Sequence, residues 1–136
     1  MSKKIKSPKP NVGNLIVPHT SDNITPKQQR PIFSFYKIRR RHCVSKCTKD
    51  EKEALIDKIY RISQLTWAEI RRAPKHGLGF EHIETSTLKV EIPNEIKGEV
   101  KFIAFRFHDK APMIGYRERR TFHIIWVDRD FTVYDH

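Results

Sequence analysis

The last third of the chain, residues 100–136, is the segment that most constrains the fold. It reads VKFIAFRFHDKAPMIGYRERRTFHIIWVDRDFTVYDH, in which apolar runs rich in Phe, Ile, Val, Tyr and Trp alternate with short polar segments. Aromatic and β-branched runs separated by turn signals are typical of strands. The pattern predicts strands at residues 100–107, 113–117, 119–127 and 131–134, and their short connections favour antiparallel pairing.

Two helices are predicted upstream of this block. The sequence TKDE at residues 48–51 is a capping box, in which a Thr hydroxyl and a Glu carboxylate satisfy backbone N–H groups at a helix start. Apolar residues then recur at helical spacing, which predicts an amphipathic helix over residues 49–64. A second T-x-x-E pattern, TWAE, begins a short helix over residues 66–73 that should end before Pro74.

The remaining segments complete an α+β arrangement. Residues 31–38, PIFSFYKI, alternate between two faces and predict a first strand. Residues 74–99 are expected to form loops, apart from a short edge strand at residues 87–92 that Pro93 closes. The expected fold is an N-terminal strand and a helical hairpin packed on a mainly antiparallel sheet of about four or five strands.

Residues 1–30 differ in composition from the rest of the chain. They contain several prolines and lysines and few apolar side chains, so burial cannot offset the entropy cost of ordering them. We therefore expect a flexible basic arm at residues 1–30 and one folded domain at residues 31–136. The arm either contacts phosphates or is a solvated tail without a role.

The charge of the chain limits the partners that it can have. The formal net charge is +11, and an excess of this size steers a protein toward polyanions, most commonly nucleic acid. An acidic protein and an anionic membrane surface are the alternatives. No window approaches the roughly 18 consecutive apolar residues of a membrane span, so insertion into a membrane is not expected.

Cys43 and Cys47 are the only cysteines. Two cysteines this close favour a reduced, cytoplasmic setting over a disulfide framework. Together with His42 they suggest a zinc site, but structural zinc usually takes two close pairs of ligands, and a second pair is missing. No metal and no cofactor are therefore expected.

The order of strand, helical hairpin and antiparallel sheet, with a final R-D-x-x-x-Y, resembles the RelE/ParE superfamily of bacterial toxins. The resemblance covers about residues 31–136 and is carried by TKDEKEALIDKIYRISQLTWAEI, by FIAFRF and MIGYRER, and by FHIIWVDRDFTVY. It implies a RelE-like fold, an endoribonuclease of the mRNA interferase type, and an acidic antitoxin partner. Arg129 and Tyr134 match the arginine and tyrosine of the family. The arginine that the family usually has early in the G-Y-R-like strand would fall near Pro112 or Met113, where this chain has none.

The resemblance also implies a chemistry. RelE-like enzymes cleave RNA, including ribosome-bound messenger, without a metal, by attack of the 2′-hydroxyl on the adjacent phosphate. Arginine keeps its proton and acts as a charge clamp, whereas histidine and tyrosine can transfer protons. The catalytic candidates are Arg106, His108, Arg117, Arg129, Tyr134 and His136. The residues expected to contact RNA are Arg39, Arg40, Arg41, Lys75, Lys110, Arg119 and Arg120. We expect the candidates within residues 106–110 and 129–136 to meet in one concave basic face.

Two other functions fit the same sequence. One is a ParE-like protein that inhibits a DNA topoisomerase and for which the histidines are dispensable. The other is a basic protein of the same fold that binds nucleic acid or a protein in a salt-dependent way without turnover. The histidines and Tyr134 favour the enzyme, and the missing arginine near Pro112 favours the binding proteins.

Overall fold

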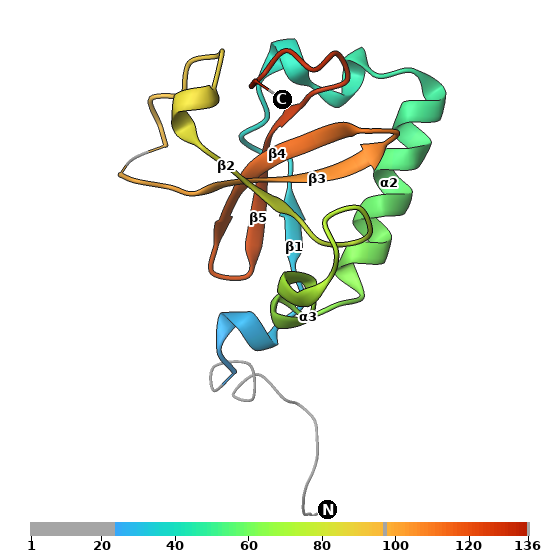
Figure 1. Ribbon diagram of the computed structural model, residues 1–136, viewed down its shortest axis with the longest axis vertical. Helices are drawn as coiled ribbons and strands as arrows, with labels where there is room; N and C mark the ends of the chain where they lie inside the picture. The colour runs from blue at the N-terminus through green and yellow to red at the C-terminus, as the bar shows by residue number, and fades with distance from the viewer. Residues whose placement is uncertain (1–23, 97, 136) are drawn as a thin grey trace, which may run out of the picture.

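One five-stranded sheet organises the computed structural model, which describes residues 24–96 and 98–135 (Figure 1). The strand order is β1-β5-β4-β3-β2. Strand β1 runs parallel to β5, and the other pairs are antiparallel. The strands are β1 (Ile32–Ser34), β2 (Glu81–Ile83), β3 (Phe102–His108), β4 (Ala111–Glu118) and β5 (Thr121–Val127). The expected α+β class and the mainly antiparallel sheet are confirmed.

The two expected helices are confirmed as α2 (Lys49–Ser63) and α3 (Trp67–Arg72). At the start of α2 the Thr48 hydroxyl accepts from the backbone N–H of Glu51 at 3.2 Å, and the Glu51 carboxylate accepts from the backbone N–H of Thr48 at 2.7 Å. The same reciprocal capping box begins α3. It follows that the two T-x-x-E patterns mark both helix starts correctly.

Helices α2 and α3 cover one face of the sheet. Trp67 of α3 packs against Phe105, whose ring contacts the ring of Phe122 at 5.2 Å between centroids. Leu55 and Ile62 of α2 belong to the same core. The second core lies on the opposite face, where loop segments take the place of helices. It contains Ile83, Ile96, Phe102, Trp126, Val133 and Tyr134.

Several strand expectations need correction. The first strand ends at Ser34 instead of running to residue 38, because the chain turns at residues 36–37. It returns to the sheet when Arg39 N–H donates to the carbonyl of Ile125 at 2.8 Å. Residues 87–92 and 131–134 are not strands: a single bridge between Leu88 and Tyr134 connects them. The edge strand is β2, in the segment expected to be a loop.

A bulge interrupts the pairing of β4 with β5. Ile114 pairs with Trp126, but Gly115 pairs with Ile124, so Ile125 is an extra residue in β5. The two backbones approach closely here, since a Cβ at position 115 would lie 1.8 Å from the carbonyl oxygen of His123. Only glycine fits this position without a shift of the strand.

The folded part begins before residue 31. Residues 26–28 form the short helix η1 (Pro26–Gln28), and the carbonyl of Gln29 accepts from the backbone N–H of Trp67 at 3.0 Å. The part of the expected arm at residues 24–30 therefore packs on α3, and residues 1–23 lie outside the described residues, as does His136. No helix of the described residues is long and apolar enough to cross a membrane.

Candidate functional site

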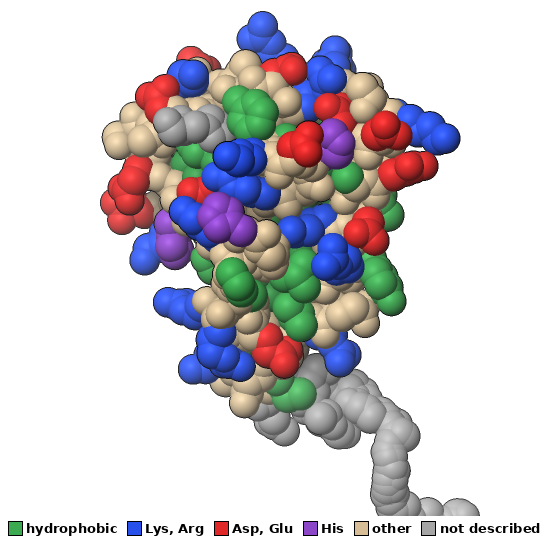
Figure 2. All heavy atoms as spheres, turned by 45° about the vertical axis from the view of Figure 1, so that its right-hand side comes forward, with side chains coloured by type: hydrophobic (Ala, Val, Ile, Leu, Met, Phe, Trp, Pro, Cys, Tyr) green, Lys and Arg blue, Asp and Glu red, His purple; other side chains and the backbone are tan. Residues whose placement is uncertain are grey.

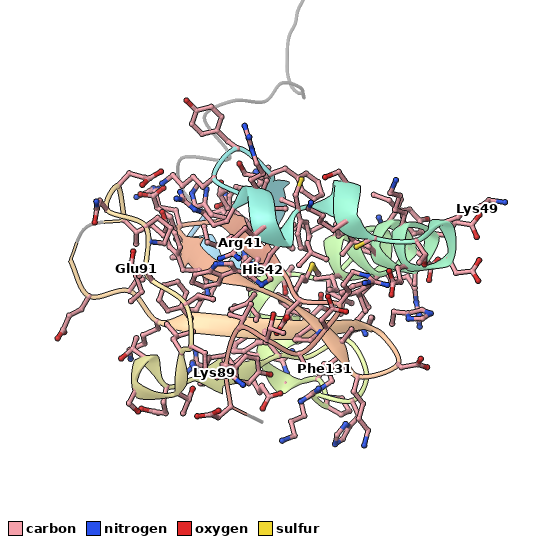
Figure 3. All side chains as sticks on the ribbon, turned by 90° about the horizontal axis from the view of Figure 1, so that it is seen from above. Arg41, His42, Lys49, Lys89, Glu91 and Phe131 are labelled. Atoms are coloured by element: carbon pink, nitrogen blue, oxygen red, sulfur yellow. The ribbon has the colours of Figure 1, made fainter. Side chains whose placement is uncertain are left out.

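Two adjoining cavities open at the end of β5, around the short helix η2 (Arg40–His42). Their volumes are about 470 and 450 Å³, and they share Arg41, His42 and Val90. Figure 3 shows Arg41 and His42 pointing from η2 into the space between the Lys89–Glu91 segment and the loop that carries Phe131. We call the two cavities together the basic groove. Its polar lining residues are Arg39, Arg40, Arg41, His42, Lys46, Lys89, Glu91, Arg129, Asp130 and Thr132.

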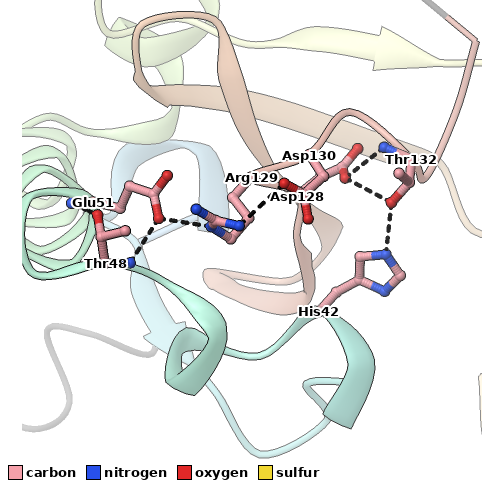
Figure 4. Close-up of polar contacts among 7 residues, drawn as sticks. All are labelled: His42, Thr48, Glu51, Asp128, Arg129, Asp130 and Thr132. Carbon is pink, nitrogen blue, oxygen red and sulfur yellow. Dashed lines mark hydrogen bonds and ion pairs between the residues drawn. The ribbon is translucent and has the colours of Figure 1, made fainter.

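A chain of hydrogen bonds fixes the one histidine of this lining. His42 Nε2 lies 3.0 Å from Thr132 Oγ1, and that hydroxyl donates to Asp128 Oδ1 at 3.3 Å (Figure 4). The contact joins η2 to the loop after β5, across 90 residues of sequence. The histidine is therefore oriented by a group from a distant part of the chain.

This chain of contacts also determines the tautomer of His42. A hydroxyl has one proton, and Thr132 gives it to the Asp128 carboxylate, which can only accept. With that proton directed at Asp128, Thr132 accepts from His42, and on this basis we assign the proton of the neutral ring to Nε2. Nδ1 is left with the free electron pair, and it is the atom of His42 that can accept a proton from a ligand.

Asp128 is fixed by the backbone of the loop that it begins. It is fully buried. Its Oδ1 accepts from the backbone N–H of Thr132 at 2.8 Å, and its Oδ2 accepts from that of Val133 at 3.0 Å. These bonds satisfy the buried carboxylate and hold Thr132 in place beneath the imidazole.

Arg129 approaches the groove from the other side. Its Nε donates to Glu51 at 2.8 Å, and its Nη1 lies 3.1 Å from Asp130. The hydrogen bond from Arg129 lowers the pKa of Glu51, and the same contact raises the pKa of Arg129. Arg129 is thereby held in one orientation with its positive charge intact, although two carboxylates share that charge.

The groove has more cations than anions. Its basic side chains come from three separate segments: η2 with the residues beside it, the loop at Lys89, and the end of β5. The acids are Glu91, which is exposed, and Asp130, which pairs with Arg129. An anion that entered would meet Arg41 and Lys46, which have no carboxylate partner among the ion pairs of the described residues. The groove is therefore suited to bind phosphate.

The structure brings together some of the residues expected from the sequence. Arg39, Arg40 and Arg41 line the groove with Arg129. Of these, Arg39 also pairs with Glu95 at 3.2 Å. The expected RNA contacts at residues 39–41 and the expected catalytic Arg129 thus share one surface.

Arg106, His108 and Tyr134 do not join that surface. Arg106 lies on the sheet face away from the helices, where it pairs with Glu81 and donates to the carbonyl of Lys110. Tyr134 is 4% exposed, and burial raises its pKa. Residues 106–110 and 129–136 do meet at one pair, because the Tyr134 side chain hydrogen-bonds the Arg106 side chain. They do not form one concave basic face, because Arg129 faces α2 on the opposite side of the sheet.

A bulge also breaks the alternation that was expected to align Arg106 with His108. Arg106 pairs with Pro112 and His108 with Ala111, which leaves Phe107 as the extra residue. His108 Nδ1 lies 3.8 Å from the Asp109 carboxylate. Lys110 follows in the exposed turn, and Lys75 is exposed in the loop after α3.

The other three expected residues lie at the opposite end of β5. Arg117, Arg119 and Arg120 are at the turn between β4 and β5, whereas the groove is at the end of β5 beyond Val127. The groove and these arginines are therefore separated by the length of the strand, and Arg117 cannot act on a ligand at Arg129.

Sequence reasoning considered His42 only as a possible zinc ligand and assigned no catalytic role to His42, Thr132 or Asp128. His42 was visible only as the end of an arginine run and as a neighbour of two cysteines. Asp128 and Thr132 are four residues apart, a spacing at which an Asp can accept from the backbone of a turn. That spacing signals the loop but not the histidine, because no local pattern connects positions 42 and 132.

Cys43 and Cys47 are free thiols beside the groove, and Cys47 is buried. Burial and the Glu51 carboxylate raise the pKa of Cys47, so this thiol stays protonated at neutral pH. Within residues 24–96 and 98–135 there is no group of three or more His, Cys, Asp or Glu that could hold a metal ion.

In comparisons with known proteins, no family model, curated protein or solved structure matches this chain.

Proposed function

We propose that this protein is a toxin-like endoribonuclease that cleaves RNA in the basic groove. The observation that carries the proposal is the His42–Thr132–Asp128 chain, which orients an imidazole in a cavity lined by Arg41, Lys46 and Arg129. A proton-transfer group beside several cations is what cleavage of a phosphodiester requires.

The proposed reaction follows from the tautomer of His42. Nδ1 accepts the proton of the RNA 2′-hydroxyl while the 2′-oxygen attacks the adjacent phosphorus. The bond from phosphorus to the 5′-oxygen breaks, and the leaving oxygen takes a proton from solvent. Arg41, Lys46 and Arg129 stabilise the negative charge that builds up on the phosphate oxygens, because arginine and lysine keep their protons.

The proposal keeps part of the RelE-like assignment and changes another part. Arg129, which matches the arginine of that family, is one of the residues that line the groove. Tyr134, which matches the tyrosine, is buried in the core with a raised pKa, so it is poorly suited to transfer protons to RNA. We assign the role proposed for Tyr134 and His108 to His42. A cytoplasmic location, action on ribosome-bound messenger and an acidic antitoxin that covers the groove belong to the same proposal.

The direct test is RNA cleavage by the purified protein in EDTA, with and without ribosomes. Wild-type protein should cut RNA and leave 2′,3′-cyclic phosphate ends. His42→Gln should lower the rate by about 100-fold or more, since general acid–base catalysis contributes roughly 10²–10⁴-fold. His76→Gln is the matched control, because His76 is an exposed loop histidine outside the groove. A wild-type protein that leaves RNA intact under both conditions, or a fully active His42→Gln, would contradict the proposal.

A second function is favoured by one observation. Glu51 and Asp130 share the charge of Arg129, which weakens its attraction for a phosphorane and fits a binding groove better than a catalytic one. In that case the protein binds nucleic acid or inhibits a target protein such as a topoisomerase, without turnover. Two results together would identify this second function. The protein would bind RNA with an affinity that His42→Gln lowers, and it would never cut that RNA.

A further inference from the structure

A second basic surface lies at the opposite end of β5 from the groove. The β4–β5 turn places its arginines beside η1 and α3: Trp67 Nε1 donates to the carbonyl of Arg120 at 2.9 Å, and Arg120 Nε donates to the carbonyl of Arg30 at 3.0 Å. Figure 2 shows Lys and Arg side chains around this lower end of the molecule. We call this surface the arginine pole; it consists of Arg30, Arg71, Arg72, Arg117, Arg119 and Arg120.

The arginines of the pole have no carboxylate partners among the ion pairs of the described residues. Those ion pairs use other arginines: Arg39, Arg61, Arg106 and Arg129. At the pole the guanidinium groups of Arg30, Arg117 and Arg120 are held instead by backbone carbonyls. Arg117 Nε donates to the carbonyl of Arg119 at 2.7 Å, and Arg30 Nε donates to that of Gln64 at 3.3 Å. Contacts through Nε hold these side chains and leave the terminal nitrogens available for a ligand.

Two of these cations are close together. The guanidinium of Arg117 lies over the ring of Trp67, 4.6 Å from its centroid. Burial lowers the pKa of Arg117, and the nearby charge of Arg71 lowers it further. The fold therefore holds two like charges near each other without an anion to separate them. An anion bound between them would remove this repulsion.

The turn itself also carries an unfavourable residue. Arg119 has φ of 58°, in the left-handed region where glycine and asparagine are the usual residues of tight hairpins. An arginine here costs stability that an asparagine would not. Arg119 therefore has an unfavourable backbone conformation that no packing contact of the described residues compensates. Departures of this kind are expected at binding sites.

We propose that the arginine pole is a second binding site for the phosphate backbone of RNA, separate from the groove. The six steps along β5 from Thr121 to Val127, at about 3.3 Å each, separate the two surfaces by roughly 20 Å. One RNA strand can therefore contact both. The charge of the pole is of one sign, and no ion pair of the described residues involves its arginines. Arginines are the usual contacts of phosphates, so the phosphate backbone of RNA fits this surface. The inference rests on the proposed function only for the choice of RNA among polyanions.

The test compares a long RNA that can contact both surfaces with a short RNA that can contact only one. A strand of about 12 nucleotides spans roughly 40 Å even when stacked at about 3.4 Å per nucleotide, whereas one of about three nucleotides fills only the groove. The pole variant is Arg71→Gln/Arg72→Gln/Arg119→Asn in the full chain. The control variant, Lys49→Gln/Lys52→Gln/Lys101→Gln, removes the same charge from exposed positions outside both surfaces. Affinity is measured by fluorescence anisotropy from low to high salt, with folding checked by thermal unfolding.

The pole variant should bind the long RNA on the order of 10- to 100-fold more weakly near 0.1 M salt, with a slope of log affinity against log salt that is smaller by about 2. Its affinity for the short RNA and its rate on that RNA should equal those of the wild type. The control variant should bind the long RNA clearly more tightly than the pole variant does. Equal affinities of the two variants for the long RNA would overturn the inference and would favour an acidic protein at the pole. Failure of the proposed cleavage leaves this measurement intact, because it records binding.

Discussion

The two ends of strand β5 carry arginines in different surroundings. At the groove, Arg129 is held by Glu51, and the histidine of the same cavity is held by Thr132 and the buried Asp128. At the pole, Arg117 is held by a backbone carbonyl and by the ring of Trp67, beside another arginine. The groove has ionic and hydrogen-bond partners for each oriented group. The pole keeps an excess of positive charge, because its six arginines have one nearby acid, Glu69, among the described carboxylates whose pKa they shift.

This difference indicates a division of roles. Chemistry requires groups held in a fixed geometry, which carboxylates and hydroxyls provide at the cost of part of the charge. Attraction of a polyanion requires net charge, and orientation matters less. The two ends of the sheet are therefore expected to respond differently to the same kinds of substitution.

The largest expected effect is at the anchor of the groove. Asp128→Ala removes the acceptor of the buried backbone N–H groups of Thr132 and Val133, so it should lower the free energy of unfolding by about 2–4 kcal/mol. Urea unfolding at neutral pH measures this loss. Asp130→Ala is the control, because Asp130 is exposed and forms a surface ion pair with Arg129; a change within about 0.5 kcal/mol is expected there. Equal urea midpoints for the two variants would show that Asp128 is not the anchor.

The next effect concerns the orientation of His42. Thr132→Val has nearly the same volume but no hydroxyl, so it should lower RNA cleavage about 10-fold by leaving the imidazole tautomer unfixed. Thr132→Ser keeps the hydroxyl and should restore most of the rate. Single-turnover cleavage of the short RNA measures both variants. If Ser and Val lower the rate equally, the hydroxyl does not position His42.

A smaller effect is expected from the carboxylate that holds Arg129. Glu51→Gln should lower the free energy of unfolding at pH 7 by less than about 1 kcal/mol, since solvent screens this partly exposed pair. The pKa of Glu51 is lowered in the folded state, so its contribution is present above the unfolded value near about 4.3 and is lost as the pH falls through the folded pKa. The difference from wild type should therefore shrink below about pH 4. Glu53→Gln, on an exposed position of the same helix, should show no such dependence.

The smallest effect is at the pole and has the opposite sign. Arg71→Gln relieves the repulsion of Arg117, so stability should rise, by no more than about 0.5 kcal/mol because the site is largely solvated. Added salt should stabilise the wild type more than this variant. Thermal unfolding from low to high salt measures both quantities. A loss of stability on this substitution would mean that Arg71 has a structural partner.

Local sequence patterns predicted the helices and strands whose positions depend on capping, periodicity and β-propensity within the segment itself. The T-x-x-E boxes and the helical spacing of Leu55 and Ile62 located α2, and the aromatic runs located β3, β4 and β5 within a few residues. The strand β2 was missed because the three residues EHI are too few to show an alternation. Residues 87–92 alternate well but are held by one bridge to Tyr134, which depends on the loop after β5.

Of the candidate site, only the arginines were identified from the sequence. The run at residues 39–41 and Arg129 were identified because cations are visible in any sequence. His42 and Thr132 were not connected because they meet through the sheet, 90 residues apart. The expected role of Tyr134 came from its match to the tyrosine of the RelE-like family, and a local match does not show that the ring of Tyr134 fills the second core.

The bulge at Ile125 determines which face each residue after it occupies. Phe122 and Ile124 face the helices, and after the extra residue Val127 faces them too. Without that residue the alternation of the strand would reverse, and Arg129 would point to the side away from Glu51. The missing Cβ of Gly115 allows the two backbones to approach at the bulge. The bulge then sets the face of the sheet on which the residues after Ile125 lie. Gly115, which does not line the groove, thereby determines that Arg129 lies on the side of the sheet where Glu51 is.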